Sequence, residues 1–192
     1  MAGGPEGEDG PVKARRRFLL LLGAALLAWV AFRREEGTTQ RVLEYFPLIR
    51  STAREAGLDP YLLAALVHVE SSGRPGSGVP GGGVGLLQVT PGAASEAGGK
   101  KVDRKDLEPV AQGLRMGALY LARMKARFGD LRLALLAYRL GPTRVSREIL
   151  ASGGPKAYLA GLWERPVGLY VSKVENLEAL YRRLAPALAP KE

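Results

Sequence analysis

The chain has 192 residues, of which 46% are hydrophobic, and this is enough for one packed domain but short for two. Its formal net charge is +9. Residues 1–37 contain six of the 28 basic residues and five of the 19 acidic residues, so residues 38–192 carry a net charge of +8. A domain with this excess of positive charge favours an anionic partner. With no cysteine and one histidine, the chain lacks disulfides, thiolate zinc sites and cysteine nucleophiles, and has too few soft ligands for a structural metal site.

The N-terminal region predicts a membrane anchor. Residues 1–12 are rich in glycine, proline and acids, which favours disorder, and residues 1–17 form a cytoplasmic segment that ends in a basic cluster. The apolar run at residues 18–32 would span about 22 Å as a helix, short of a hydrocarbon core of about 30 Å. A cleaved signal peptide fits this length equally well. We favour an uncleaved signal anchor, because Leu26 or Trp29 stands where cleavage requires a small residue, and the excess of bases before the run places the N-terminus inside.

The remaining chain predicts one mainly α-helical domain. Residues 33–44 read as a polar linker, residues 45–184 as the domain, and residues 185–192 as an Ala/Pro-rich tail. Apolar periodicity, caps and breakers predict helices at 47–56, 60–69, from 91, 109–128, 131–140 and 170–184. Strand signals are scarce, so the glycine-rich stretch 73–85 is expected to be a loop or a short hairpin beside a cleft.

Glu70 is the strongest candidate for a catalytic group. Asp59 is a good N-cap and Pro60 suits the first position of the helix that leads to it. Glu70 ends the apolar run, at the edge of the glycine-rich loop. A carboxyl group there is well placed for a raised pKa and for donating a proton near neutral pH. His68, two residues earlier, is expected to be a surface or packing residue.

One other motif matches a known pattern without carrying its function. Gly76–Gly81 matches G-x-G-x-x-G, but no strand precedes it and Pro80 stands where a helix should open, which excludes a dinucleotide site. No nucleic-acid motif is present, so binding to nucleic acid would rest on charge alone and is not expected.

An ordered set of motifs carries a family resemblance. Its members are Glu70-Ser71, Gln88 within Gly85–Pro91, Gly117–Leu121, Ala134–Pro142 with Tyr138, and Tyr170–Val174. Their order and spacing resemble the catalytic domain of the soluble lytic transglycosylase (SLT) family, over roughly residues 45–178. That family has the goose-type lysozyme fold, within the lysozyme-like α+β superfamily.

The resemblance implies a chemistry that needs one carboxyl group and neither a metal nor a cofactor. Glu70 would protonate the oxygen of the β-1,4 bond between MurNAc and GlcNAc in peptidoglycan. As a base it would then help the 6-hydroxyl of the same sugar attack, giving a 1,6-anhydro end. Ser71, Gln88, Tyr138 and Tyr170 correspond to substrate-binding positions, although each is about as well explained as an ordinary packing or backbone-bonding residue.

The chain also departs from the family pattern. Val79 replaces a serine expected to orient the reacting sugar, and Arg139 replaces an asparagine. Two alternatives therefore stay open: a non-catalytic peptidoglycan-binding or scaffolding module, and a lysozyme-type hydrolase that uses Asp103, Asp106 or Glu164 as a second carboxylate.

The expected location follows from the anchor and the substrate. The domain would stand outside the inner membrane, in the periplasm or cell envelope, held by residues 18–32. Its partners would be peptidoglycan glycan strands and, through a local opening of the wall, a secretion or cell-surface apparatus.

Overall fold

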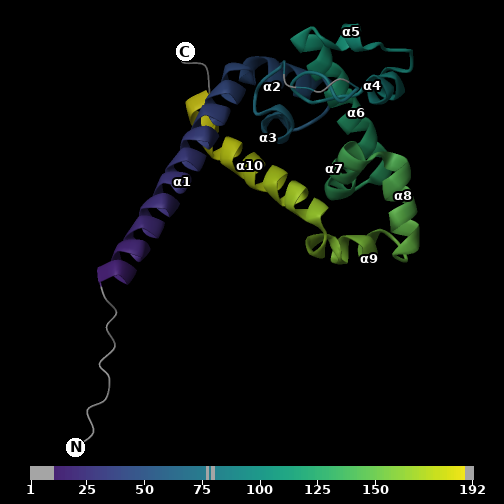
Figure 1. The fold of residues 1–192 in the computed structure, drawn as a ribbon. Helices are drawn as coiled ribbons and strands as arrows, with labels where there is room; N and C mark the ends of the chain where they lie inside the picture. The colour runs from purple at the N-terminus through teal and green to yellow at the C-terminus, as the bar shows by residue number, and fades with distance from the viewer. Residues whose placement is uncertain (1–10, 77, 79–80, 189–192) are drawn as a thin grey trace, which may run out of the picture. The chain divides into compact units, whose positions relative to one another are not determined.

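The computed structural model describes residues 11–76, 78 and 81–188 (Figure 1). The helices found there are, in chain order, α1 (Pro11–Glu44), α2 (Phe46–Glu55), α3 (Pro60–Ser71), α4 (Pro91–Gly98), α5 (Arg104–Leu107), α6 (Val110–Phe128), α7 (Leu131–Leu140), α8 (Pro142–Ala151), α9 (Pro155–Ala160), the 3-10 turn η1 (Leu162–Glu164) and α10 (Pro166–Leu188). The prediction of a mainly α-helical protein is confirmed. The predictions made for residues 1–10, Val79, Pro80 and 189–192 lie outside the described residues.

The chain divides into two compact units, Met1–Thr38 and Thr39–Glu192. In the first unit, helix α1 contains residues 18–32, and its large apolar side chains from Leu19 to Phe32 are exposed. Across the described ranges, no helix combines the length and the apolar character that crossing a membrane requires. The membrane anchor is therefore not confirmed.

Residues 33–44, predicted to be a polar linker, are helical and form the last part of α1. Local contacts support this helix: the Thr38 hydroxyl donates to the Arg34 carbonyl at 2.9 Å, and Arg33 pairs with Glu36. The second unit accordingly begins before residue 45, and Val42 is fully buried in its core.

The core of the second unit surrounds α3. Asp59 caps this helix by accepting hydrogen bonds from the backbone of Tyr61 and Leu62, as predicted. Helices α2 and α10 both pack against α3, and α6 packs against α4 and α7 (Figure 1). His68 is buried and lies 2.9 Å, through Nδ1, from the hydroxyl of Tyr181, so it is a packing residue that ties α3 to α10.

The glycine-rich segment folds into a tight hairpin-like loop without a strand in its described part. Val84 and Val89 form an isolated antiparallel bridge with two backbone hydrogen bonds. Gly83 has to be glycine, since a Cβ atom there would overlap the backbone of Gln88. Leu86, in the tip of this loop, is fully buried and anchors the loop to the core.

Several elements differ from the sequence prediction. The short α5 and η1 are additional to the predicted helices, as are α8 and α9, and helix α10 begins at Pro166 instead of residue 170. In α8, α9 and α10, proline occupies the first helical position, where its missing N–H costs nothing.

Candidate active site

Glu70 lies in the last turn of α3, where the chain leaves the helix sharply. Ser72 caps the helix in the left-handed conformation, with φ of 53°, and Gly73 follows with φ of 70°. Gly73 also permits close contact with α1, because a Cβ atom at this position would lie 2.9 Å from the Cβ atom of Arg41. The Arg41 side chain donates to the Ser72 carbonyl at 2.9 Å and fixes the turn.

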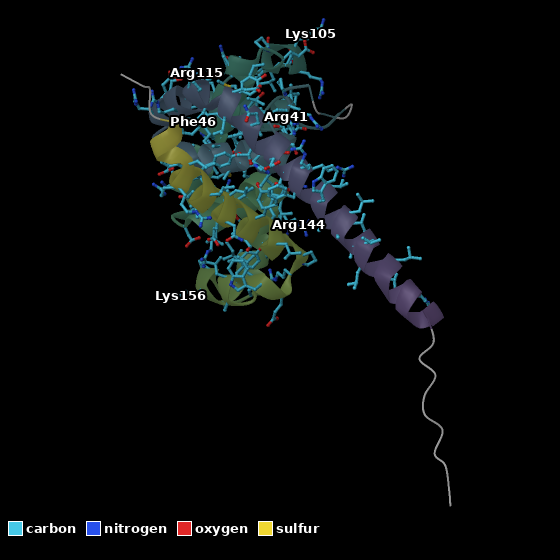
Figure 2. The ribbon with its side chains drawn as sticks, turned by 90° about the vertical axis from the view of Figure 1, so that its left-hand side faces the viewer. Arg41, Phe46, Lys105, Arg115, Arg144 and Lys156 are labelled. Atoms are coloured by element: carbon cyan, nitrogen blue, oxygen red, sulfur yellow. The ribbon has the colours of Figure 1, made fainter. Side chains whose placement is uncertain are left out.

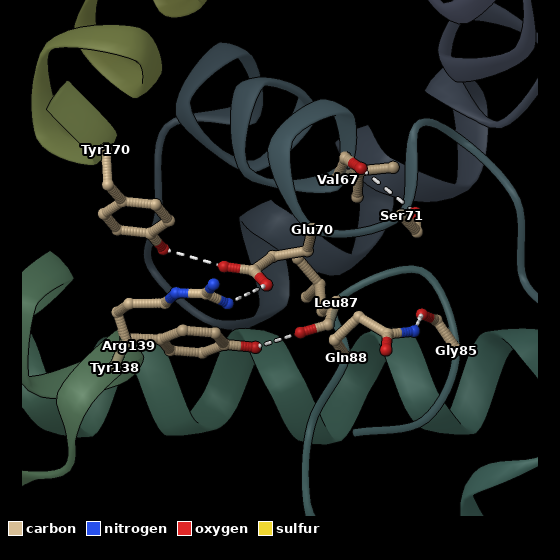
Figure 3. Close-up of polar contacts among 9 residues, drawn as sticks. All are labelled: Val67, Glu70, Ser71, Gly85, Leu87, Gln88, Tyr138, Arg139 and Tyr170. Atoms are coloured by element: carbon tan, nitrogen blue, oxygen red, sulfur yellow. Dashed lines mark hydrogen bonds and ion pairs between the residues drawn. The ribbon is translucent and has the colours of Figure 1, made fainter. Parts of the chain in front are cut away.

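Two side chains from distant helices converge on the Glu70 carboxyl group (Figure 3). The Tyr170 hydroxyl of α10 donates to Oε1 at 2.9 Å, and the Arg139 guanidinium of α7 donates from Nη1 to Oε2 at 3.4 Å. The Glu70 side chain is only 5% exposed. Burial raises the pKa of Glu70 above its usual value, while the Tyr170 hydrogen bond and the Arg139 charge offset part of that rise.

Arg139 and Tyr170 also contact each other. The guanidinium carbon of Arg139 lies 5.6 Å from the centroid of the Tyr170 ring, within the range of a cation–π contact. Burial and the neighbouring Glu70 charge raise the pKa of Tyr170 well above its ordinary value, so its hydroxyl remains a donor throughout the neutral range.

Tyr138 holds the loop beside Glu70. Its hydroxyl donates to the Leu87 carbonyl at 2.7 Å, and its ring lies 5.4 Å from the ring of Tyr120. Gly117 of α6 makes this packing possible, because a Cβ atom there would lie 2.7 Å from the Leu87 Cβ atom and 3.1 Å from the Tyr138 hydroxyl. Burial raises the pKa of Tyr138 well above its usual value, so it too stays neutral.

Gln88 and Ser71 hold positions set by backbone contacts. Gln88 takes a positive φ of 46°, and its side-chain amide donates to the Gly85 carbonyl at 2.8 Å. The Ser71 hydroxyl is buried and donates to the Val67 carbonyl one turn earlier, at 3.0 Å. This geometry suits the backbone-bonding role for Ser71, whereas Gln88 lies on the loop that Tyr138 fixes close to Glu70 (Figure 3).

Two of the other acidic candidates, Asp103 and Asp106, are engaged in local structure. The backbone N–H of Asp103 donates to the Asp106 carboxylate at 2.8 Å at the start of α5, and Asp103 also pairs with Lys101. Among residues 11–76, 78 and 81–188, no group of three histidine, aspartate or glutamate side chains is arranged to hold a metal ion.

Positive charge is distributed over the second unit. In Figure 2, Lys105 and Arg115 lie toward one end of this unit and Lys156 toward the other.

Arg139 contacts the Glu70 carboxyl group, although the sequence predicts no role for it in the site. From the sequence it is only a departure from the family pattern. An arginine in the last turn of a helix is ordinarily solvated, so the sequence carries no signal of this contact.

Comparison with known proteins identifies relatives of this chain. The family model described as Transglycosylase SLT domain matches residues 47–160. The chain is 28% identical over 149 residues to the Transglycosylase of Enterobacteria phage PRD1, covering 77% of this chain and 48% of that protein. It is 33% identical over 108 residues to membrane-bound lytic murein transglycosylase F of Desulfosudis oleivorans, covering 53% of this chain and 23% of that protein.

A solved structure has a similar fold. The lytic transglycosylase Slt of Pseudomonas aeruginosa, determined as an inactive mutant, matches with a TM-score of 0.62 and 23% identity, covering 76% of this chain and 24% of that chain. This chain therefore spans less than half the length of each of these proteins.

Proposed function

Because the chain belongs to the Transglycosylase SLT domain family, whose model matches more than half of it, we propose that it is a peptidoglycan lytic transglycosylase with Glu70 as its catalytic acid. The observation that carries this proposal is the buried Glu70 carboxyl group, held by Tyr170 at 2.9 Å, with a pKa raised by burial. A raised pKa keeps a proton available at higher pH than a solvated glutamate would.

The proposed reaction uses Glu70 twice. It first donates its proton to the oxygen of the bond between MurNAc and GlcNAc, and the 2-acetamido group of the muramyl sugar stabilises the developing cation. The resulting carboxylate then accepts a proton from the sugar's own 6-hydroxyl as that oxygen attacks the anomeric carbon. The proton lost in the first step is thereby restored, and the product is a 1,6-anhydro sugar.

The single carboxyl group explains why an intramolecular nucleophile is expected. Hydrolysis normally uses two carboxylates that flank the bond. Asp103 and Asp106 are engaged at the start of α5, and within the described part of the chain no second acid is among the groups that shift the pKa of Glu70. The 6-hydroxyl of the bound sugar has a large effective concentration compared with water, so transglycosylation is favoured.

One observation favours the alternative of a non-catalytic peptidoglycan-binding module. The Arg139 guanidinium contacts the carboxyl oxygen Oε2 and stabilises the ionised form, which cannot donate a proton. The same residue replaces an asparagine of the family pattern.

The test compares wild type with Glu70→Gln on purified sacculi. The amide keeps the shape of the side chain but cannot donate the proton, so we expect turnover to fall about 10²–10⁴-fold while sacculus binding is retained. Mass spectrometry should find released muropeptides lighter by one water than hydrolytic products. Reducing ends would instead indicate the hydrolase, and a wild type that binds sacculi without releasing product would indicate the binding module.

We further propose that residues 18–32 hold the protein at the membrane, with the domain outside and acting on the cell envelope, where it would serve wall turnover or a secretion or surface apparatus. Support comes from the exposed apolar side chains of α1, including Leu21, Leu27 and Phe32, and from the flanking arginines. Sequencing of the membrane-extracted protein should begin at or near Met1. A soluble species that starts between Trp29 and Glu36 would show cleavage instead.

A further inference from the structure

A second surface site lies between α8 and the start of α10. It is a pocket of about 600 Å³. Its lining combines cations and one acid with aliphatic side chains: Arg144, Arg165, Glu148, Leu140, Ala151 and Val167. None of these residues takes part in the contacts of Glu70.

The charges in this pocket are organised around Glu148. Arg144 donates to its Oε1 at 2.8 Å, Tyr158 donates to its Oε2 at 2.7 Å, and Arg165 lies 3.8 Å from Oε2. These contacts lower the pKa of Glu148, so it stays ionised and the cluster of two arginines and one glutamate carries a net positive charge.

Both cations remain accessible to a ligand. The Arg144 side chain is 57% exposed and that of Arg165 is 37% exposed. A guanidinium group has five N–H donors, and the described contacts with Glu148 leave most of them available. The guanidinium carbon of Arg165 also lies 4.4 Å from the centroid of the Tyr158 ring, a cation–π contact that helps to position it. The pocket therefore presents positioned donors for an anion.

The pocket adjoins the Glu70 site through two helices. Val167 lies three residues before Tyr170 on α10, so the two share one face of that helix at neighbouring positions. Leu140 directly follows Arg139 at the end of α7. The pocket lining therefore neighbours, along both helices, the residues that contact Glu70.

We propose that this pocket binds the carboxylate-bearing peptide attached to the muramyl sugar of the substrate strand. This rests on the proposed function. A peptide with carboxylates and small aliphatic side chains matches arginines set among Leu140, Ala151 and Val167.

The test measures binding and turnover with and without the peptide. Arg144→Gln removes the more exposed cation and keeps much of the side-chain length. The control is Arg182→Gln on α10, because Arg182 is similarly exposed at 52% and also pairs with a glutamate four residues away. Each substitution is made in the wild type and in the Glu70→Gln background, where binding is measured without turnover.

We expect Glu70→Gln protein to bind a muropeptide more tightly than the same disaccharide without its peptide. Arg144→Gln should reduce this peptide-dependent gain about three- to tenfold, and Arg182→Gln should leave it unchanged. In the wild-type background, Arg144→Gln should lower kcat/KM on native sacculi by a similar factor, but not on strands stripped of peptide by an amidase.

The proposal would be overturned if Arg144→Gln lowered kcat/KM equally on peptide-bearing and on stripped strands, or if the peptide gave no gain in binding affinity. Chemical amidation of the peptide carboxyl groups shows whether the gain depends on their negative charge. If the gain survives amidation, the pocket does not recognise carboxylates. The binding measurements test the pocket even if the wild type proves inert. Failure of the proposed function would be seen separately, as the absence of released muropeptides.

Discussion

Replacement of Arg139 by asparagine tests how the site controls its acid. In the structure, the Arg139 cation lies 3.4 Å from Glu70 Oε2 and stabilises the ionised carboxylate. Catalysis needs the protonated form, so activity should fall as pH rises through the Glu70 pKa. The positive charge of Arg139 lowers the pKa of Glu70, so its removal should raise that pKa. The alkaline limb of the kcat/KM profile should therefore move to higher pH.

The expected size follows from the exposure of the pair. Arg139 is 56% exposed, so solvent screens its charge, and an interaction of this kind is worth about 0.2–1 kcal/mol. At about 1.36 kcal/mol per pH unit, the limb should move up by at most about 0.7 unit. The groups that face Glu70 are Tyr170 from α10 and Arg139 from α7, with Tyr138 close by, and both tyrosines remain neutral over this range.

The assay is the pH dependence of kcat/KM on solubilised glycan strands, at low and high ionic strength. Arg139→Lys keeps the charge and serves as the matched control, so its limb should stay near that of the wild type. Added salt should move the wild-type limb toward that of Arg139→Asn, because it screens an exposed charge. A limb that stays in place or moves to lower pH in Arg139→Asn would refute the reasoning.

Three further predictions follow from the same contacts. Tyr170→Phe removes the hydrogen-bond donor to Glu70 Oε1. Because a hydrogen bond to a charged group is worth about 1.5–3 kcal/mol, the rate of muropeptide release should fall about ten- to a hundredfold. An unchanged rate would exclude a role for this bond. Glu70→Gln should melt at a higher temperature than the wild type at pH 7, because the folded variant no longer buries an ionised carboxylate whose pKa is raised. Calorimetry should find that this gain in melting temperature disappears as the pH falls below the pKa of an unfolded-state glutamate, about 4.3. Gly117→Ala should lower stability by about 1–3 kcal/mol in denaturant unfolding because its Cβ atom would overlap Leu87, whereas Gly92→Ala, with open space around it, should be neutral or stabilising.

Much of the fold follows from local signals in the sequence. Asp59 and Pro60 set the start of α3, and Asp130 caps α7 through the Leu133 N–H at 3.1 Å. The helices missed by sequence reasoning are short or open after a glycine. For α8 and α9 the Gly-Pro pairs at 141–142 and 154–155 read as breakers, although each proline starts a helix.

The candidate site is less accessible to sequence reasoning. Glu70 could be identified because its helix is apolar and ends there, and Tyr170 because of the family resemblance. The convergence of α3, α7 and α10 on one carboxyl group depends on tertiary packing that no local pattern encodes. Arg139 shows this most clearly, because an exposed arginine at a helix end is ordinarily a solvated residue, and only the 3.4 Å contact gives it a role.

The position of Arg139 depends in turn on a chain of buried contacts. Gly117 lets Leu87 approach α6, and the Leu87 carbonyl then accepts the Tyr138 hydrogen bond at 2.7 Å. This bond fixes the end of α7, where Arg139 is the next residue, so the cation is held beside Glu70 by packing rather than by its own exposed side chain. A substitution in α6 that shifts Leu87 should therefore alter the pH dependence of catalysis without touching the carboxyl group.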